Sequence, residues 1–466
     1  MLSRRKTLES LQKKTDIQTD MNRRSFLKKV SRFSMGLGFY FSGASLFKPN
    51  QLSAAHKSSE FLVKDPNKIL TLHRALDYKI ISAYGEKMSD GYQVPHSPDG
   101  MACFQNEEKV VLVVNHELNE NSGIKKSPFL NKQIEDPLES FNLYDKKAYG
   151  GTINIIYDEK TNKVKEQFLS LSGTLTNCAG GATPWGTWLT CEETTLGPNK
   201  DLRKPHGYVF EVKPTVKRGL QKAIPIKSMG RFSHEAVAFD PATGDAFLTE
   251  DRSDGLFYRF IPSQTGKLFR GKLFALSIEG HPQDTRNWEN GFYLKGVKYK
   301  VRWVPLSDTD PKDDSLRKKG AEKGASFFAR GEGLATDGKS IYFTCTSGGP
   351  KKRGQIWRYT PGPTKYSSGD TIELWQEINN KQTLNMPDNI TLSPWGDIIV
   401  CEDNSNINRL WGIRPNGTPY IIAQNSYSGA EFAGACFSPS GKTLFVNLQQ
   451  NGMTFAIKGD WNALRI

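Results

Sequence analysis

The sequence predicts an all-β protein, a six-bladed β-propeller with loop insertions, preceded by an N-terminal signal segment. Three observations support this prediction. A hairpin-like unit recurs along the chain, helical patterns are almost absent after residue 60, and 42 Gly and 24 Pro are spread throughout the 466 residues. A unit repeated every 50–90 residues or so is typical of propeller blades.

Each copy of the unit reads as a strand, a Gly-containing turn and a strongly apolar second strand. Five copies align, and a sixth is more degenerate: residues 177–193, 233–251, 331–345, 387–403 and 434–447, with 99–117 as the sixth. A third strand, opened by Gly and rich in aromatic residues, often follows, as at 207–212, 255–260 and 354–359. A pair of β-sandwiches is the alternative, but it explains six similar hairpins less well.

The sequence divides into an extension at 1–20, a signal segment at 21–55 and a propeller domain at 56–466. Two intervals in that domain, 118–147 and 262–326, are too long for a bare blade and are interpreted as loop insertions, which could form a lid. The charged run from Asp308 to Lys323 is interpreted as a solvated loop rather than a binding patch.

The net charge of +14 is concentrated at the N-terminus, because residues 1–55 carry 11 Lys and Arg against 3 Asp and Glu. The mild excess left on the domain suits an anionic substrate and argues against nucleic-acid binding. No apolar run reaches the ~20 residues of a bilayer span, so the mature form is expected to have none. A monomer is expected.

The segment from Met21 to Lys29 matches a twin-arginine export signal, with Arg23 and Arg24 as the pair. An uncharged run, 33–47, and small residues ending at Ala55 follow in the order of a cleavable signal. A basic amphipathic helix is the alternative. The signal predicts the twin-arginine translocase as a partner and a periplasmic or secreted location. Export of a folded protein also argues against disulfides among the six cysteines.

In a propeller, the first strand of each blade lines the central channel. The polar residues that open these strands are Asp99, Cys178, Glu235, Glu332 and Asp388, with Glu431 near the sixth. A ring of carboxylates would repel strongly without cations. Oxygen ligands favour Ca²⁺, whereas one thiolate favours a transition metal such as iron.

A second polar set lies at the end of the following strand in each hairpin. Counting a similar number of residues forward from Cys178, Glu235, Glu332 and Asp388 leads to Glu193, Glu250, Thr346 and Glu402. Turn caps or exposed strand ends are the alternative for any one of these residues.

Basic and amide groups stand beside these acids. Arg231, Arg252 and Arg330 flank them, and Arg330 is the preferred phosphate clamp because Arg can hold phosphate bidentately. His116 is a candidate acid or ligand, although a lone His is more often structural, and His234 could simply orient Glu235.

The segment 177–193, Asn-Cys-Ala-Gly-Gly-Ala-Thr-Pro-Trp-Gly-Thr-Trp-Leu-Thr-Cys-Glu-Glu, resembles the metal-cluster segment of PhoX-type alkaline phosphatases. Residues 230–235, 329–332, 386–389 and 437–449 resemble further segments of that family in the same order.

This resemblance implies a phosphomonoesterase that holds a mixed cluster of iron and calcium. It implies Cys178, Glu192, Glu193, Glu235, Glu332 and Asp388 as metal ligands. The candidate catalytic residues are Arg330, Asn115 and His116, and the candidate substrate-binding residues are Arg330, Asn389 and Arg231.

Two other functions compete with this interpretation. One is a calcium-dependent propeller lactonase or phosphotriesterase, whose site needs no thiolate. The other is a non-enzymatic, metal-stabilised binding propeller, which has no need of an inward-facing Arg330. Cys178 in its Gly-rich context favours the phosphatase.

Replacing Arg23 and Arg24 with Lys should leave the full-length precursor in the cytoplasm, because the translocation receptor reads the arginine pair. Cell fractionation with immunodetection measures this. Normal export of the double variant would show that the segment is not a twin-arginine signal.

Overall fold

The computed structural model describes residues 60–134, 140–362, 369–380 and 383–465. The strands all belong to one compact unit, which spans residues 53–64 and 69–466. The expected extension at 1–20 and signal segment at 21–55 lie outside the described residues.

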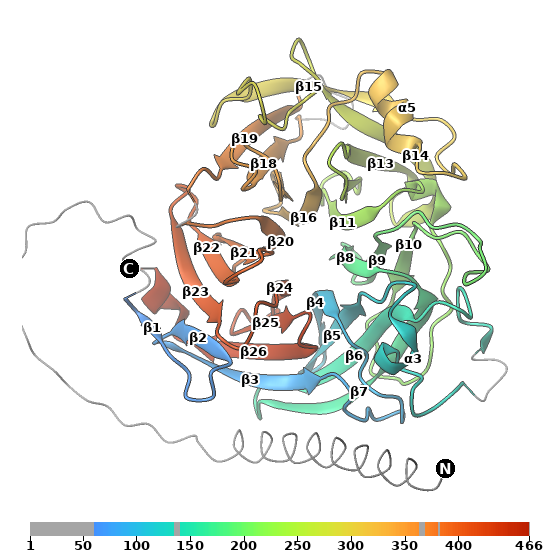
Figure 1. Ribbon diagram of the computed structural model, residues 1–466, viewed down its shortest axis with the longest axis vertical. Coiled ribbons are helices and arrows are strands. Elements are labelled where there is room, and N and C mark those ends of the chain that lie inside the picture. Colours follow the sequence, from blue (N-terminus) through green and yellow to red (C-terminus); the bar gives the residue numbers. More distant parts are fainter. Residues whose placement is uncertain (1–59, 135–139, 363–368, 381–382, 466) are drawn as a thin grey trace, which may run out of the picture. The chain divides into compact units, whose positions relative to one another are not determined.

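The centre of this unit is lined by six strands that surround a common axis (Figure 1). They are β4 (Pro98–Asn106), β8 (Asn177–Ala182), β11 (His234–Phe239), β16 (Gly331–Thr336), β20 (Pro387–Leu392) and β24 (Phe432–Phe437). Each inner strand contacts the next one in the chain, and β24 contacts β4, so the ring is closed.

Each inner strand opens an antiparallel blade that extends outward. The first blade continues with β5 (Lys109–His116), β6 (Gly150–Asp158) and β7 (Lys163–Thr174). The second continues with β9 (Trp188–Glu192) and β10 (Val209–Val212). The third continues with β12 (Ala246–Glu250), β13 (Phe257–Gln264), β14 (Lys267–Ile278) and β15 (Lys298–Pro305). The fourth blade continues with β17 (Ile341–Cys345), β18 (Gln355–Thr360) and β19 (Thr371–Glu377). The fifth continues with β21 (Ile398–Glu402), β22 (Arg409–Ile413), β23 (Pro419–Asn425), β2 (Leu70–His73) and β1 (Leu62–Val63). The predicted all-β propeller is confirmed.

The last blade joins both ends of the described chain. It consists of β24, β25 (Thr443–Leu448), β26 (Met453–Gly459) and β3 (Leu76–Ala83). The early strand β3 pairs with β26 along its whole length, from Leu76 opposite Gly459 to Ala83 opposite Met453. This pairing fastens the start of the domain to its end.

The second strands are buried on both faces because each blade packs between two neighbours. Val110 to Val114 of β5, for example, are all at most 1 % exposed. This burial explains the near-continuous apolar runs of the repeat, which do not alternate as half-buried strands do. Trp357 and Trp411, on β18 and β22, fill the space between blades.

The interval 262–326 differs from the loop insertion expected for it. It holds the end of β13 and all of β14 and β15. Because β15 pairs with β19, the third and fourth blades share one nine-stranded sheet. The interval 118–147 has no strand among its described residues, and holds the short helix α3 (Gly123–Lys126).

The charged run from Asp308 to Lys323 is expected to be a solvated loop, which holds for residues 308–315 but is wrong for the rest. It contains α5 (Leu316–Glu322), which buries Leu316 and Arg317 against the third blade. Arg317 pairs with Asp254 at 2.8 Å and with Asp314 at 2.7 Å, which explains how a charged side chain is buried there.

Two 3₁₀ turns, η1 (Lys227–Met229) and η2 (Trp461–Leu464), complete the elements. Within the described residues, no helix is long and apolar enough to cross a membrane.

The inner strands approach one another so closely that Gly434 has no room for a side chain. Its φ is +63°, and an added Cβ would overlap the carbonyl oxygen of Asp99 on β4. We expect Gly434→Ala to lower the free energy of unfolding by about 3 kcal/mol, measured by urea denaturation. Gly197→Ala is the matched control, because nothing lies within 4 Å of its added Cβ. Equal stability of the two variants would contradict this packing argument.

Candidate metal centre and active site

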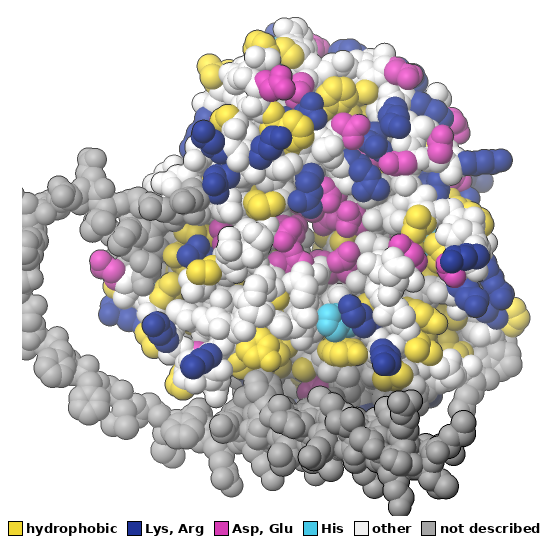
Figure 2. All heavy atoms as spheres, in the orientation of Figure 1, with side chains coloured by type: hydrophobic (Ala, Val, Ile, Leu, Met, Phe, Trp, Pro, Cys, Tyr) yellow, Lys and Arg dark blue, Asp and Glu magenta, His cyan; other side chains and the backbone are white. Residues whose placement is uncertain are grey.

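One end of the central channel holds a polar pocket of about 160 Å³. Figure 2 shows Asp and Glu side chains gathered around the opening at the centre of the propeller. The pocket is lined by Asp99, Glu117, Cys178, Glu193, Glu235, Asp251, Arg330, Glu332, Asp388, Asn389, Asp403, Glu431 and Gln449. It therefore unites residues from all six blades.

A bulge at the start of each inner strand aims the first set of side chains into this pocket. On β4, for example, Pro98 pairs with His116 and the next ladder pair is Met101 with Val114. The same break occurs on all six inner strands. The residues that follow the last pair before the break are Asp99, Cys178, Glu235, Glu332 and Asp388 in five blades, and Gly434 in the sixth. The predicted inner positions are thus brought together.

The second set comes from the residue just after each second strand. The last residue of that strand pairs with the first residue of the inner strand, as Asn177 pairs with Glu192. The following residue then turns into the pocket: Glu117, Glu193, Asp251 and Asp403. In the fourth blade this position is Thr346, whose hydroxyl donates to the carbonyl of Pro387 at 2.9 Å.

The expectation that Glu192 lies among the metal ligands is not supported by its position, because consecutive residues of a strand face opposite ways. Its carboxylate points into the blade and accepts hydrogen bonds from the backbone N–H groups of Leu175 and Gly207, at 2.9 and 2.8 Å. It also lies 2.6 Å from Nδ1 of His206.

Glu250 and Glu402 are also expected pocket residues, and like Glu192 they accept hydrogen bonds outside the pocket. Glu250 accepts from the hydroxyl of Tyr258 at 2.7 Å, and Glu402 accepts from the N–H groups of Asn385 and Arg409 at 2.8 and 2.9 Å. The pocket residues are the next ones in the chain, Asp251 and Asp403.

Arg231 and His116 also lie outside the pocket lining. Arg231 is 1 % exposed and donates to the carbonyls of His206 and Pro311, each at 2.8 Å. His116 is buried, and burial lowers the pKa of its ring to about 4. Its Nδ1 lies 2.9 Å from the carbonyl of His96. Both side chains hold backbone segments in place.

Asn115 supports the pocket from behind. Its side-chain N–H₂ donates to the carbonyls of Cys178 and Ala179, at 3.0 and 2.8 Å, which the bulge leaves outside the ladder. It is fully buried and does not line the pocket. It therefore positions the thiol and does not face the channel.

Three other bulges are held by the same device, a side chain on the second strand of the preceding blade. The carbonyls of Glu332, Asp388 and Asp99 accept from Thr249, Thr344 and Asn447 at 2.5, 2.6 and 2.6 Å. Each hydrogen bond satisfies a buried carbonyl that would otherwise be costly to leave unpaired.

The acidic side chains form three linked groups. Ligand atoms lie within 4.8 Å of one another in Cys178, Glu193 and Glu235, in Glu235, Glu332 and Asp388, and in Asp388, Asp403 and Glu431. Glu235 and Asp388 each belong to two groups, so the three groups form one chain across the pocket.

Burial and mutual repulsion raise the pKa of several carboxyl groups in this pocket. Burial is the largest cause for Glu235, Glu332 and Asp388, and neighbouring carboxylates add to it. The pKa of Asp99 rises to about 6 and that of Glu117 to about 8. Gln449 relieves part of this repulsion, because its amide donates to both carboxylates, at 2.6 and 2.7 Å.

The carboxylate oxygens and the Cys178 sulfur of the pocket are suitable ligands for metal cations. So many buried carboxylates remain ionised together only if positive charge lies among them. The group with Cys178 offers one sulfur beside oxygen, whereas the other two groups offer oxygen alone. Hard cations prefer oxygen ligands, and a thiolate favours transition metals.

Arg330 stands at the edge of this charge cluster. Its Nε and Nη2 form a fork with the carboxylate of Asp251, at 2.9 and 3.0 Å, and Nη2 also donates to Glu332 at 2.8 Å. These two carboxylates raise its pKa above the usual value, so it stays charged. Nη1 has no hydrogen-bond partner among the described residues, and the side chain is 32 % exposed. One nitrogen is therefore left for a ligand.

Asn389 lines the pocket but bridges two blades. It donates to Asp388 at 3.1 Å and accepts from the N–H of Gly434 at 2.6 Å. Both of its polar atoms thus already have a protein partner.

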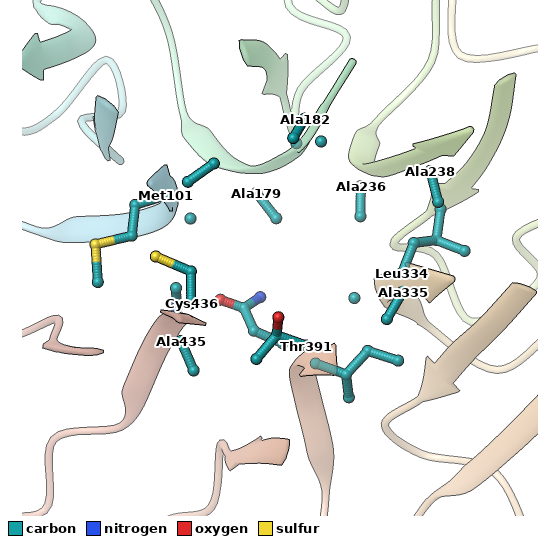
Figure 3. Close-up of a pocket in the computed structure, with 18 of the residues that line it drawn as sticks. Met101, Ala179, Ala182, Ala236, Ala238, Leu334, Ala335, Thr391, Ala435 and Cys436 are labelled. Atoms are coloured by element: carbon teal, nitrogen blue, oxygen red, sulfur yellow. Dashed lines mark hydrogen bonds between the residues drawn. The ribbon is translucent and has the colours of Figure 1, made fainter. Parts of the chain in front are cut away.

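Beyond the acidic ring the channel becomes apolar. Figure 3 shows small side chains around this part, among them Ala179, Ala236, Ala335 and Ala435. This cavity of about 320 Å³ has no charged residue in its lining. The chemistry therefore belongs to the acidic end.

The fold and site define an all-β propeller with a candidate metal centre at one end of its channel. The sequence profile of the family described as alkaline phosphatase PhoX matches residues 58–452. The chain belongs to this family, which makes it a phosphoric monoester hydrolase and a member of a metal-dependent family.

A solved structure of this family agrees with the fold. PhoX of Pseudomonas fluorescens, in complex with the transition-state analogue vanadate, matches with a TM-score of 0.61 and 16 % identity, covering 84 % of this chain and 96 % of that one. A gluconolactonase from Xanthomonas campestris matches with a TM-score of 0.40 and 8 % identity, over 82 % of this chain and 97 % of that one. No protein with a curated description matches the chain.

The one-residue difference between Glu192 and Glu193 yields a sharp test. We expect Glu193→Gln to lose bound metal, because it removes a negative ligand from the pocket. We expect Glu192→Gln to keep the metal but to lower the free energy of unfolding by roughly 1–3 kcal/mol, through weaker hydrogen bonds to buried N–H groups. Metal analysis and urea denaturation of both variants measure this. Metal loss from Glu192→Gln with retained stability would reverse the assignment.

Proposed function

We propose that this chain is an exported alkaline phosphatase that releases inorganic phosphate from phosphomonoesters at the acidic end of its channel, with iron and calcium bound there. Family membership gives the reaction class. The observation that carries the proposal is the chain of three acidic groups with Arg330 beside it at an open mouth.

The metal ligands in this proposal are Cys178, Glu193, Glu235, Glu332 and Asp388. Iron would be held at the group that contains the Cys178 thiolate, and calcium by the groups that offer only carboxylate oxygen. When bound, these cations would supply positive charge to offset the negative charge of a phosphoryl group in transfer. Asp403 and Glu431 complete the third group, and sequence reasoning had not selected Asp403.

Arg330 would hold a phosphoryl oxygen through its free Nη1. Its orientation is fixed before any substrate arrives, because Asp251 and Glu332 occupy its other nitrogens. Its backbone adopts φ +56°, a left-handed conformation uncommon for a residue other than glycine, which starts β16 in the register that turns Glu332 inward. A preorganised cation of this kind needs little rearrangement in the transition state.

Substrate would enter from the face shown in Figure 2, where the acidic side chains surround the opening, since the far part of the channel is apolar and has no charged lining residue. Asn389, with its side-chain atoms engaged by Asp388 and Gly434, would shape the pocket near Arg330. Asn115 would act on Cys178 by holding its backbone.

Export by the twin-arginine route would suit this site, because that route carries folded proteins and the acidic ring is completed only when all six blades are in place. The enzyme would then act in the periplasm or outside the cell. All six cysteines are free, and Cys178 is among them.

We expect the metal-loaded protein to hydrolyse an aryl phosphate at alkaline pH, with activity lost in EDTA and restored by calcium when iron has been retained. Arg330→Ala should lower kcat/KM by about 10²-fold, the scale for loss of one charged transition-state contact, with the metal content unchanged. Arg358→Ala is the matched control: Arg358 is similarly exposed, at 29 %, and pairs with Glu373 on the outer strands of the same blade. It should keep full activity.

Metal analysis of the same preparation tests the cluster, where iron together with calcium is the expected result. Hydrolysis of lactones without hydrolysis of aryl phosphates, in a fully metallated preparation, would overturn the proposal in favour of a lactonase.

A further inference from the structure

A positively charged loop stands at the rim of the acidic pocket. It follows β17 and comprises residues 347–353, Ser-Gly-Gly-Pro-Lys-Lys-Arg. Backbone hydrogen bonds join both ends of the loop to segments that lead to pocket carboxylates, at Arg330 before Glu332 and at Met386 before Asp388. The N–H of Thr346 donates to the carbonyl of Arg330 at 3.0 Å, and the N–H of Met386 donates to the carbonyl of Arg353 at 2.7 Å. The loop therefore lies at the pocket end of the fourth blade, next to the segment that leads to Asp388.

The charges of this loop are available to a ligand. Lys351 and Lys352 are exposed, and neither they nor Arg353 form an ion pair with any described residue. Arg353 donates from Nη1 to the amide oxygen of Asn385 at 3.2 Å. Lys and Arg side chains lie beside the acidic opening on the side of β16 and β18 (Figure 2). Three adjacent cations thus lack a carboxylate partner.

An aromatic ring holds part of this group in place. Lys352 Nζ lies 4.5 Å from the centre of the Trp288 ring, and Arg286 Cζ lies 4.1 Å from it. The ring is itself fixed, because its N–H donates to the carbonyl of Ser347 at 2.7 Å. Cation–π contacts of this kind orient an ammonium without neutralising it.

The equivalent loops of the next two blades carry no such charge. Residues 404–408 follow Asp403 and residues 450–452 follow Gln449, and neither stretch contains Lys or Arg. Among these three neighbouring blades, the cations are therefore concentrated in the blade that provides Arg330. A phosphoryl group held by Arg330 would leave the alcohol part of the ester pointing out of the mouth, beside this loop.

We propose that Lys351, Lys352 and Arg353 form a subsite for a second anionic group on the substrate, so that the preferred phosphomonoesters carry a carboxylate or another phosphate on their alcohol part. This inference rests on the proposed phosphatase function. The chemical basis is direct pairing of Lys and Arg with an anion at the rim, where the acidic pocket alone would repel it.

The test compares two esters that differ by one charge, phenyl phosphate and carboxyphenyl phosphate. In Lys351→Gln/Lys352→Gln, kcat/KM for the carboxylated ester should fall about tenfold, the effect of losing ~1.4 kcal/mol of pairing, and that for phenyl phosphate by less than about threefold. The control is Lys339→Gln/Lys442→Gln, which removes the same charge from exposed hairpin turns at the opposite end of β16 and β24. Equal losses for both esters, or equal losses in the control, would overturn the subsite.

A binding measurement separates this inference from the proposed function. Calorimetry with the non-hydrolysable benzylphosphonate and carboxybenzylphosphonate should show tighter binding of the carboxylated compound, and the double variant should lose that preference. The preference would support the subsite even if neither ester were hydrolysed, which would count against the phosphatase function alone. Equal binding of the two phosphonates to the unaltered protein would overturn the subsite.

Discussion

The close approach of six inner strands at one axis is the constraint on which this structure depends. A side chain added at Gly100 would lie 2.8 Å from the carbonyl oxygen of Cys178, and one added at Gly333 would lie 2.8 Å from that of Asp388. The strands pack this tightly only because small residues occupy those positions. The same geometry crowds one thiol and many carboxylates into a single pocket. Electrostatic repulsion and close packing are therefore two results of one arrangement.

The bulges convert this crowding into a defined site. A regular ladder would send alternate residues to opposite faces, whereas the bulge at each strand start re-aims one residue into the channel. The displaced backbone carbonyls then need new partners, and Asn115 and Thr249 provide them from the preceding blade. Each ligand position is thus fixed by its own blade and by its neighbour, so the site and the ring are stabilised by the same hydrogen bonds.

The sequence predicted the fold and the inner set of pocket residues because the repeats align at those positions. It misplaced the second set by one residue in two blades, where Glu250 and Glu402 were chosen instead of Asp251 and Asp403. The turns between the paired strands differ in length, since they run over 337–340, 393–397 and 240–245 in the fourth, fifth and third blades. A fixed count therefore does not reach the same position in each blade, and one extra residue reverses the face of a strand. The roles of Arg231 and Asn115 depend on backbone carbonyls that folding brings to them, which no local pattern indicates. The strands in 262–326 were missed because β14 interrupts its apolar residues with Lys, Arg and Gly.

The pairing of β3 with β26 has a consequence for how the chain folds. This contact joins residues from nearly opposite ends of the domain, so the average sequence separation of native contacts is large and the search for the closed ring is slow. Until β26 is made, β3 remains an unpaired edge, the kind of intermediate surface that associates with other chains. Ring closure also comes after synthesis of the last blade. The protein therefore completes its fold late, and a chaperone that shields β3 would favour the native outcome over aggregation.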